Sequence, residues 1–596
     1  MLKVFRQFLD MFDTTLRRQF WLLAVMTTLM ALIDLIGVAA VLPFLAVAAD
    51  PQAIRDSAAL LWLHDVTGAT SDRGFLVFLG VLVLGFILIG LAVKLVTQYS
   101  IIRFAHGCNR NFSRRLMARH LFRPYAWHLG QNSADLGTLI LSEAEQLVAR
   151  SLLPAMRVLS QGAVVLALVL LLLVVDPVIA IAASLGVGGT YIGIFLFVRR
   201  QLSRIGEQRI LANRDRYRVT QEAFGGIKEA KLAGLETHYI ARYDSPAAIY
   251  ARTSADSQIY GELPRFMLEA VAFGGLVLLI LALLVLQQAR LGEIVPVLGV
   301  FGFAILKIFP AIQQIYGAVT QIRFTAPMLD KLHDELTTQP EPAPHPVAAM
   351  PALPLRRELV LEDLHYAYPQ AGRAALTGLT LRVPANNTIG IVGGSGAGKT
   401  TAVDLILGLL APDAGRILID GTPLSPQNLR SWQDTLGYVP QQIFLSDDSI
   451  AANIAFGLAP EARDRKAIEQ AARLAELHDF IIHELPQGYD TPVGERGVRL
   501  SGGQRQRIGI ARALYRDPSV LIFDEATSAL DNVTERAVMS AVTRLGRAKT
   551  IIMIAHRLST VKECDTIFLL RDGRLEAAGT FDELIAKSET FRRMAM

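Results

Sequence analysis

Apolar residues follow two different patterns in the two parts of the chain. In the first part, six apolar stretches are each long enough to cross about 30 Å of hydrocarbon. They lie near residues 20–49, 74–99, 152–175, 177–198, 266–288 and 294–318. From about residue 356 onward, short β-rich runs alternate with helical stretches, a pattern typical of a largely parallel α/β sheet. The fold class we predict is therefore an α-helical, six-span transmembrane domain followed by an α/β domain.

A proline-rich stretch separates these two parts. Residues 337–355 read TTQPEPAPHPVAAMPALPL, a composition that favours a stiff, extended linker. We therefore expect a transmembrane domain over 1–336 and the α/β domain over 356–596. The two long connections between spans have a helical composition, so we expect helices that extend past the bilayer. Their turning points are predicted near 124–137 and 222–236.

The first twenty residues carry mixed charge and regularly spaced phenylalanines. Phe5, Phe8 and Phe12 recur at helical spacing and fall on one face of a helix. This pattern predicts an amphipathic helix on the cytoplasmic membrane surface, with the phenylalanines against lipid. The apolar run that follows is too long for the core of a cleavable signal peptide.

Charge and cysteine content narrow the class of protein. The 596-residue chain is 52% hydrophobic and has a net charge of +5. Cations crowd the connections between spans 2 and 3 and between spans 4 and 5, which places both termini in the cytoplasm. This topology explains the positive charge without a nucleic-acid partner. The two cysteines, Cys108 and Cys564, lie far apart in sequence and predict neither a disulfide framework nor a metal site.

A glycine-rich string follows the predicted strand TIGIV and opens a predicted helix. Its residues are Gly393, Gly394, Ser395, Gly396, Ala397, Gly398, Lys399 and Thr400. This is a phosphate loop in its strand–loop–helix context, where backbone N–H groups and the helix N-terminus face phosphate. Lys399 is expected to neutralise the β- and γ-phosphates, and the Thr400 hydroxyl to bind Mg²⁺. ATP and Mg²⁺ are therefore the predicted cofactors.

Two adjacent acids follow the apolar strand SVLIF. Asp524 suits the Mg²⁺ shell, and Glu525 suits polarisation of the attacking water. Two solvated acids at a strand end would be an ordinary alternative. That alternative becomes improbable because LSGGQ at 500–504 lies just before them and SALD at 528–531 just after.

With these motifs the chain resembles the ABC transporter superfamily. The resemblance implies functional roles at many positions. Nucleotide contacts are implied for Tyr368, Thr401, Ser501, Gly502, Gly503, Gln504 and Asp531, and catalytic roles for Gln441, Glu525 and His556, with Gln441 also a Mg²⁺ ligand. In this family the LSGGQ segment serves the ATP held by the opposite subunit. An ATP hydrolase coupled to transport is therefore expected.

The order of the domains is similar to that of exporters. One transmembrane and one nucleotide domain per chain imply a homodimer with two equivalent ATP sites, while a heterodimer with another half-transporter is the alternative. The expected location is the bacterial cytoplasmic membrane, with membrane lipids around the spans. A DNA-repair or translation ATPase is excluded by the six spans, and a channel would leave the hydrolytic residues without a use.

Ionisable residues within apolar spans are candidates for cargo contacts. Lys94, Arg265 and Lys307 would form a basic chamber suited to phosphate or pyrophosphate. Two alternatives stay open at this point. Lys94 and Arg265 could extend to the membrane interface, and Asp34 could pair with Lys307.

Several strings in the membrane half resemble bacterial flippases of lipid-linked oligosaccharides. They are VLPFLAVAAD, IIRFAHG and LPRFMLEA, together with PQQIFLSDDSIAANIAFG in the α/β part. The resemblance implies a polyprenyl-pyrophosphate-linked glycan as cargo, moved from the cytoplasmic to the outer leaflet. The alternative is an exporter of lipid A-like lipids, drugs or other amphiphiles with the same architecture.

Overall fold

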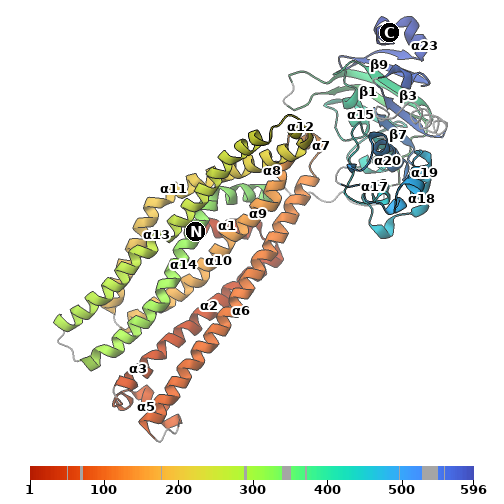
Figure 1. Ribbon diagram of the computed structural model, residues 1–596. Coiled ribbons are helices and arrows are strands. Elements are labelled where there is room, and N and C mark those ends of the chain that lie inside the picture. Colours follow the sequence, from red (N-terminus) through yellow and green to blue (C-terminus); the bar gives the residue numbers. More distant parts are fainter. Residues whose placement is uncertain are drawn as a thin grey trace. The chain divides into compact units, whose positions relative to one another are not determined.

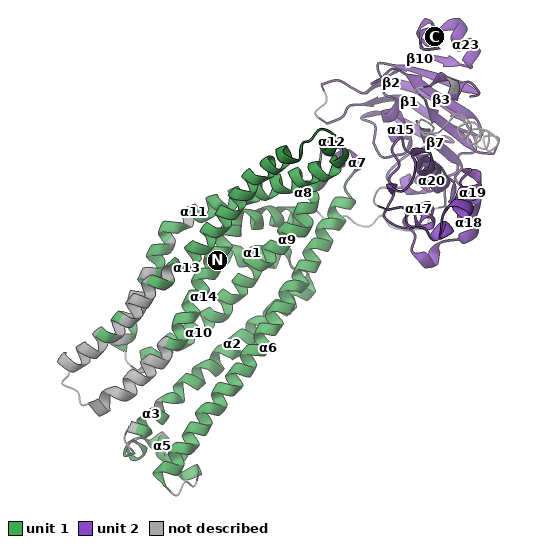
Figure 2. Ribbon diagram, viewed as in Figure 1, with its two compact units in different colours: residues 1–123, 131–342 green, residues 124–130, 343–596 purple. Residues whose placement is uncertain are grey.

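The computed structural model describes most of the chain. The described residues are 1–49, 51–67, 71–175, 177–286, 291–338, 351–369, 372–494, 497–525, 548–555 and 557–595. They form two compact units (Figure 2): residues 1–123 with 131–342, called here the helical unit, and residues 124–130 with 343–596, called the α/β unit.

Long helices build the helical unit, and several run side by side in Figure 1. Its elements are α1 (Leu2–Met11), α2 (Thr14–Ala39), α3 (Val41–Ala49), α4 (Ala53–Asp56), α5 (Ala58–Thr67), α6 (Asp72–Leu121), α8 (Ser133–Gly137), the π-helical η1 (Thr138–Glu143), α9 (Ala144–Leu147), the π-helical η2 (Val148–Leu152), α10 (Leu153–Val175), α11 (Pro177–Gly225), α12 (Ile227–Leu232), α13 (Glu236–Leu286) and α14 (Leu291–Thr337). The predicted helical class of this part is confirmed.

Three helical stretches among the described residues are long and apolar enough to cross a membrane. They are Thr14–Ala48, Asp72–Leu121 and Ala134–Val174. The first two begin at side-chain caps, because Asp13 accepts from the N–H of Leu16 and Ser71 accepts from the N–H of Gly74. The other three predicted spans lie in α11, α13 and α14, where many side chains fall outside the described part. The count of six spans therefore stays a prediction.

The N-terminal helix α1 packs against protein. Phe8 and Phe12 are buried in a cluster with residues of α2, α6 and α14. The ring of Phe12 lies 5.6 Å from that of Phe104 and 6.3 Å from that of Phe112, both on α6. The prediction that these phenylalanines face lipid is wrong, because they pack against aromatic side chains of α2 and α6 and their neighbours.

A buried polar network lies where the π-helical segment η1 meets α11. The Arg209 guanidinium donates to the carboxylate of Glu143 at 2.9 Å, and the Asn213 amide donates to the other oxygen of that carboxylate at 2.8 Å. Arg209 also donates to the Gln146 side chain. Close by in sequence, Gly206 of α11 touches the backbone of Phe324 on α14 so closely that a Cβ would collide with it.

The α/β unit combines two sheets with surrounding helices. Its elements are α7 (Tyr125–His128), β1 (Glu358–Tyr366), β2 (Leu376–Pro384), β3 (Thr388–Gly393), α15 (Lys399–Ile406), β4 (Ala414–Ile419), β5 (Thr422–Pro423), α16 (Leu429–Gln433), β6 (Leu436–Val439), α17 (Ile450–Ile454), η3 (Pro460–Ala462), α18 (Arg465–Leu474), α19 (His478–Glu484), η4 (Gly488–Asp490), α20 (Gly502–Leu514), β7 (Val520–Asp524), β8 (Thr550–Ile554), α22 (Leu558–Val561), β9 (Thr566–Arg571), β10 (Arg574–Gly579), α23 (Phe581–Lys587) and α24 (Glu589–Ala595).

The larger sheet has the strand order β10-β9-β3-β8-β7-β6. Its strands pair in parallel from β9 to β6, and β10 pairs antiparallel with β9. Strands β3, β7 and β8 are buried along their whole length, which explains their unbroken apolar sequences. The smaller sheet, β2-β1-β4-β5, is antiparallel. The predicted α/β class is confirmed. Because β3, β6 and β7 run parallel, their carboxyl ends lie at the same edge of the larger sheet.

Candidate ATP site and membrane cavity

The phosphate loop joins β3 to α15, and its turns need glycine. Gly393 ends β3 with a φ of 154°, and Gly398 precedes α15 with a φ of 95°. A Cβ on Gly393 would collide with the backbone of Leu570, and one on Gly398 would lie 2.8 Å from the carbonyl oxygen of Ala375. The loop is therefore held against neighbouring backbone, with the N-terminus of α15 at its end.

Lys399 fills the middle of this loop. Its ammonium donates to the carbonyl oxygens of Gly393 and Gly394 at 2.9 and 3.0 Å. Burial lowers the pKa of Lys399, and the charges of Glu525 and Asp524 oppose that shift. A buried cation in a glycine-rich loop at a helix N-terminus suits the β- and γ-phosphates of a nucleotide.

The predicted acids lie at the end of β7. Asp524 is buried and Glu525 is partly exposed. Glu525 has a φ of 51°, a left-handed conformation that costs a non-glycine residue on the order of 1–3 kcal/mol and is concentrated at functional sites. The Gln441 side chain, which follows β6, donates to the Glu525 carboxylate at 2.8 Å. The structure thus brings together Gln441 and Glu525, which lie far apart in sequence.

These residues fit a magnesium ion and a nucleotide phosphate. Asp524, Thr400 and Gln441 offer carboxylate, hydroxyl and amide oxygens, and oxygen ligands are those that Mg²⁺ prefers. Thr400 lies exposed in the first turn of α15, next to the phosphate loop. Four glycines, at 393, 394, 396 and 398, keep much of the loop backbone free of side chains, so its N–H groups can approach a phosphate.

The predicted adenine-stacking residue, Tyr368, lies beside the same helix. Its hydroxyl is 3.0 Å from the hydroxyl of Thr401 in α15. Its ring packs edge-on against that of Tyr366, with ring centroids 5.1 Å apart. The hydroxyl contact anchors Tyr368 to the helix that follows the phosphate loop and leaves its ring partly exposed.

The LSGGQ segment forms the start of helix α20. Ser501 is the N-cap and accepts from the N–H of Gln504 at 3.2 Å, while the Ser501 N–H donates to the Gln504 side chain at 2.8 Å. This reciprocal capping box fixes the backbone of Gly502 and Gly503 at a helix N-terminus. The N-terminus of α20 can therefore bind an anion, as the N-terminus of α15 can. The predicted residues Asp531 and His556 lie outside the described residues.

The three predicted cargo cations have different surroundings. The Lys307 ammonium lies 2.7 Å from the Asp34 carboxylate, which is the pairing that the sequence left open. Lys94 is exposed on α6. Arg265, on α13, lines a cavity inside the helical unit.

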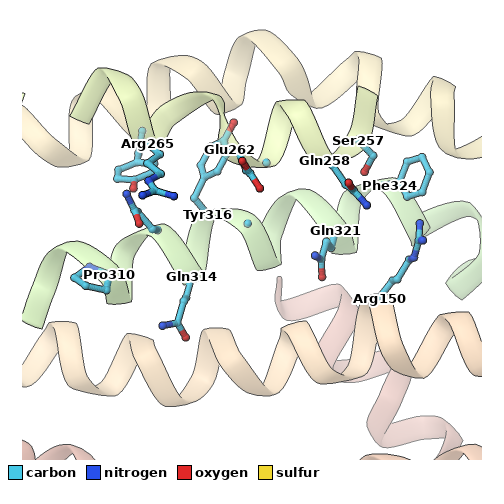
Figure 3. Close-up of a pocket in the computed structure, with 14 residues that line it drawn as sticks. Arg150, Ser257, Gln258, Glu262, Arg265, Pro310, Gln314, Tyr316, Gln321 and Phe324 are labelled. Atoms are coloured by element: carbon cyan, nitrogen blue, oxygen red, sulfur yellow. The ribbon is translucent and has the colours of Figure 1, made fainter. Parts of the chain in front are cut away.

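That cavity holds about 400 Å³ and is bordered by η2, α11, α13 and α14 (Figure 3). Its polar lining includes Arg150, Arg265, Glu262, Gln258, Gln314 and Gln321. Two further lining groups, the Tyr191 hydroxyl and the Gln313 amide nitrogen, are buried and have no hydrogen-bond partner among the described residues. Buried polar groups are normally hydrogen-bonded, so these two groups could form hydrogen bonds to a polar ligand in the cavity.

Sequence reasoning missed most of this lining. Gln258, Glu262 and Arg265 recur at helical spacing on α13, and that spacing is a readable sign that their side chains share one face of the helix. It also missed Tyr438, which donates to the Asp524 carboxylate at 3.4 Å. Tyr438 lies in the string YVPQQ, but its partner Asp524 lies on another strand, β7, so the sequence gives no sign of their contact.

Comparison with known proteins places this geometry in one family. Residues 376–528 match the family model described as "ABC transporter", and residues 21–304 match "ABC transporter transmembrane region". The chain is 31% identical over 484 residues to an ATP-dependent lipid A-core flippase of Saccharophagus degradans, covering 81% of this chain and 80% of that protein. The chain belongs to the ABC transporter family. The predicted family is therefore confirmed.

Further similarities support the exporter type for this ABC transporter. An ATP-dependent lipid A-core flippase of Cupriavidus metallidurans is 34% identical over 400 residues, covering 66% of this chain and 65% of that protein. A bacterial Atm1-family ABC exporter solved with ATP bound is 26% identical, with a TM-score of 0.78 and 98% of both chains covered. This ABC transporter is an exporter-type membrane protein that binds ATP and couples its hydrolysis to transport.

Proposed function

We propose that this ABC transporter moves a lipid with a phosphorylated sugar headgroup from the cytoplasmic to the outer leaflet of the bacterial inner membrane. The observation that carries the proposal is the cavity of the helical unit. Arg150 and Arg265 supply positive charge for phosphate, while the glutamine amides and Tyr191 supply neutral hydrogen-bonding groups for sugar hydroxyls. Glu262 adds an acceptor for hydroxyl donors.

The cations contribute unequally to this proposed site. Asp34 neutralises much of the charge of Lys307, because the two side chains form an ion pair between α2 and α14. Arg265 lies within the cavity lining, whereas Lys94 lies exposed on another helix. We therefore assign headgroup binding first to Arg265, and we keep Lys94 and Lys307 as weaker candidates.

Two lipids share the chemistry of this cargo. A polyprenyl-pyrophosphate-linked oligosaccharide is the cargo that the membrane-half sequence strings suggest. A lipid A-type glycolipid is the alternative, and the names of the relatives from Saccharophagus degradans and Cupriavidus metallidurans favour it. Both carry phosphate next to sugar on a hydrocarbon anchor, so the cavity chemistry suits either.

The ATP site is proposed to act in a homodimer. Mg²⁺ would neutralise phosphate charge when bound, held by Thr400, Asp524 and Gln441. Glu525 orients the attacking water, and its hydrogen bond to Gln441 connects it to the segment after β6. The capped N-terminus of α20 would face the nucleotide of the partner copy, together with Asp531. The cations in the long connections between spans support a topology with both termini and the ATP site in the cytoplasm.

Proteoliposomes that contain the full-length protein provide the test. Leaflet transfer would be measured separately for a polyprenyl-pyrophosphate-linked oligosaccharide, for lipid A and for a neutral amphiphile, each with Glu525→Gln as the inactive control. ATP-dependent transfer of either of the first two supports the proposal and identifies the lipid. Transfer of the neutral amphiphile alone would contradict it and favour drug or simple lipid export.

Matched variants on α13 test the cavity. Arg265→Ala should lower transfer of the phosphorylated lipid and its stimulation of ATP hydrolysis, with unstimulated hydrolysis unchanged. Arg252→Ala is the control, because Arg252 is an exposed arginine on the same helix that does not line the cavity. Equal losses in the two variants would remove Arg265 from the headgroup site.

A further inference from the structure

A short segment of the chain outside the main α/β sequence belongs to the α/β unit. Residues 124–130, which include α7, group with residues 343–596 (Figure 2). Ala126 of α7 packs against the buried core that contains strand β3 and helix α15. Helix α7 therefore lies on the body that carries the phosphate loop.

Tyr125 is the first residue of α7 and precedes Ala126. Burial raises the pKa of the Tyr125 phenol, with further contributions from the charge of Asp404 and from Tyr368. Asp404 lies in α15, five residues after Lys399, and its side chain is buried. The phenol of α7 thus lies within electrostatic reach of a buried carboxylate behind the phosphate loop.

The same carboxylate interacts with the predicted metal ligand. Burial and the charge of Asp524 raise the pKa of Asp404 to about 6. Tyr438 in β6 donates its hydroxyl to the Asp524 carboxylate at 3.4 Å. Burial raises the pKa of Tyr438, and Asp524, Asp404 and Tyr125 each add to that shift. The hydrogen bond joins Tyr438 to Asp524, and Asp404 and Tyr125 lie within electrostatic range of that pair. The four side chains are called here the tyrosine–carboxylate cluster.

We propose that Tyr438 is a positioning residue for the magnesium ligand Asp524, and that Tyr125 ties the α7 segment to the same cluster. A carboxylate that ligates a metal is oriented by the hydrogen bonds it accepts from neighbouring groups. The Tyr438 hydroxyl contacts one oxygen of the Asp524 carboxylate and would thereby fix the orientation of that carboxylate toward the metal.

The inference rests on the proposed assignment of Asp524 to Mg²⁺, and its test separates the two. Full-length protein with a non-hydrolysable ATP analogue would be titrated with Mn²⁺, a paramagnetic substitute, and free Mn²⁺ measured by electron paramagnetic resonance. Loss of a partner of a metal ligand typically weakens metal affinity about 10–100-fold. Tyr438→Phe should therefore weaken Mn²⁺ binding about tenfold, with analogue binding in EDTA unchanged.

Tyr366→Phe is the matched control. Tyr366 is buried in the same region, and Asp404 also raises the pKa of its phenol, after burial and the charges of Tyr368 and Asp413. Its hydroxyl has no hydrogen-bond partner among the described residues, so its removal should leave Mn²⁺ binding within about twofold. Unchanged analogue binding in EDTA also shows that each variant is folded.

Four further outcomes decide the inference. Tyr438→His, which restores a hydrogen-bond donor, should recover part of the lost Mn²⁺ affinity. In Tyr438→Phe, the Mg²⁺ concentration for half-maximal hydrolysis should change more than kcat. Equal Mn²⁺ binding in Tyr438→Phe and Tyr366→Phe would overturn the role of Tyr438 but leave the metal assignment of Asp524 in place. Unchanged binding in Asp524→Asn would overturn the metal assignment as well.

The α7 arm has its own variant. Tyr125→Ala should weaken Mn²⁺ binding in the same direction as Tyr438→Phe but less strongly, because the Tyr125 phenol reaches Asp524 only through its neighbours in the cluster. Wild-type Mn²⁺ binding in Tyr125→Ala would overturn the connection between the α7 segment and the metal ligand.

Discussion

Replacement of Arg209 by alanine should strongly destabilise the helical unit. The Arg209 and Glu143 side chains are 1% and 4% exposed, and their charged atoms are 2.9 Å apart. Without the guanidinium, the Glu143 carboxylate stays buried with the Asn213 amide as its one remaining hydrogen-bond partner among the described residues. Removing one member of a buried ion pair costs about 3–5 kcal/mol, mainly because the remaining charge is uncompensated.

Thermal denaturation of the detergent-solubilised protein measures this loss. Each kcal/mol lowers the midpoint by roughly 2–4 °C in domains of 150–250 residues and by less in larger ones, so for the larger helical unit we expect a shift of about 4 °C or more. Arg218→Ala is the control on the same helix. Arg218 pairs with Asp215 at 2.7 Å, but the side chains are 43% and 46% exposed, and such a pair contributes about 0.2–1 kcal/mol.

A double-mutant cycle identifies the cause of the loss. Glu143→Gln combined with Arg209→Gln removes both charges, so the double variant should be markedly more stable than the sum of the two single losses predicts. Additive losses, or a shift for Arg209→Ala no larger than that for Arg218→Ala, would refute the reasoning. In that case water or another group would compensate the Glu143 charge.

Three further predictions concern packing, catalysis and pH. Gly206→Ala should destabilise the protein by about 1–3 kcal/mol in thermal unfolding, since its Cβ meets the Phe324 backbone, whereas Gly137→Ala, with open space around it, should not. Lys399→Ala should abolish ATP hydrolysis; wild-type turnover in a phosphate-release assay would contradict the site. The pKa of Asp404 rises from 3.8 to about 6 on folding, so its ionisation costs stability as pH rises through that window. Asp404→Asn should therefore raise the melting midpoint of ATP-free protein above pH about 6, and this gain should vanish as the pH falls through the same window.

The ATP site could be located from sequence because its chemistry is local. The phosphate loop needs only a strand, a glycine-rich turn and a helix in succession, and Gly393 through Thr400 occupy that order. The capping box of Ser501 and Gln504 likewise lies within four consecutive residues. The membrane character of the first half follows from composition, since a long apolar helix needs no particular neighbour to be read as a span.

Only the tertiary structure separated side chains that look alike in sequence. Lys307 and Arg265 are both cations in apolar surroundings, but the packing of helices pairs Lys307 with Asp34 and leaves Arg265 in a cavity lining. Phe8 would suit lipid as well as it suits the aromatic cluster in which it is buried. Tyr438 and Asp524 meet because β6 and β7 are neighbours in the sheet. A residue type sets which partners a side chain can have, but long-range packing decides which partner it meets.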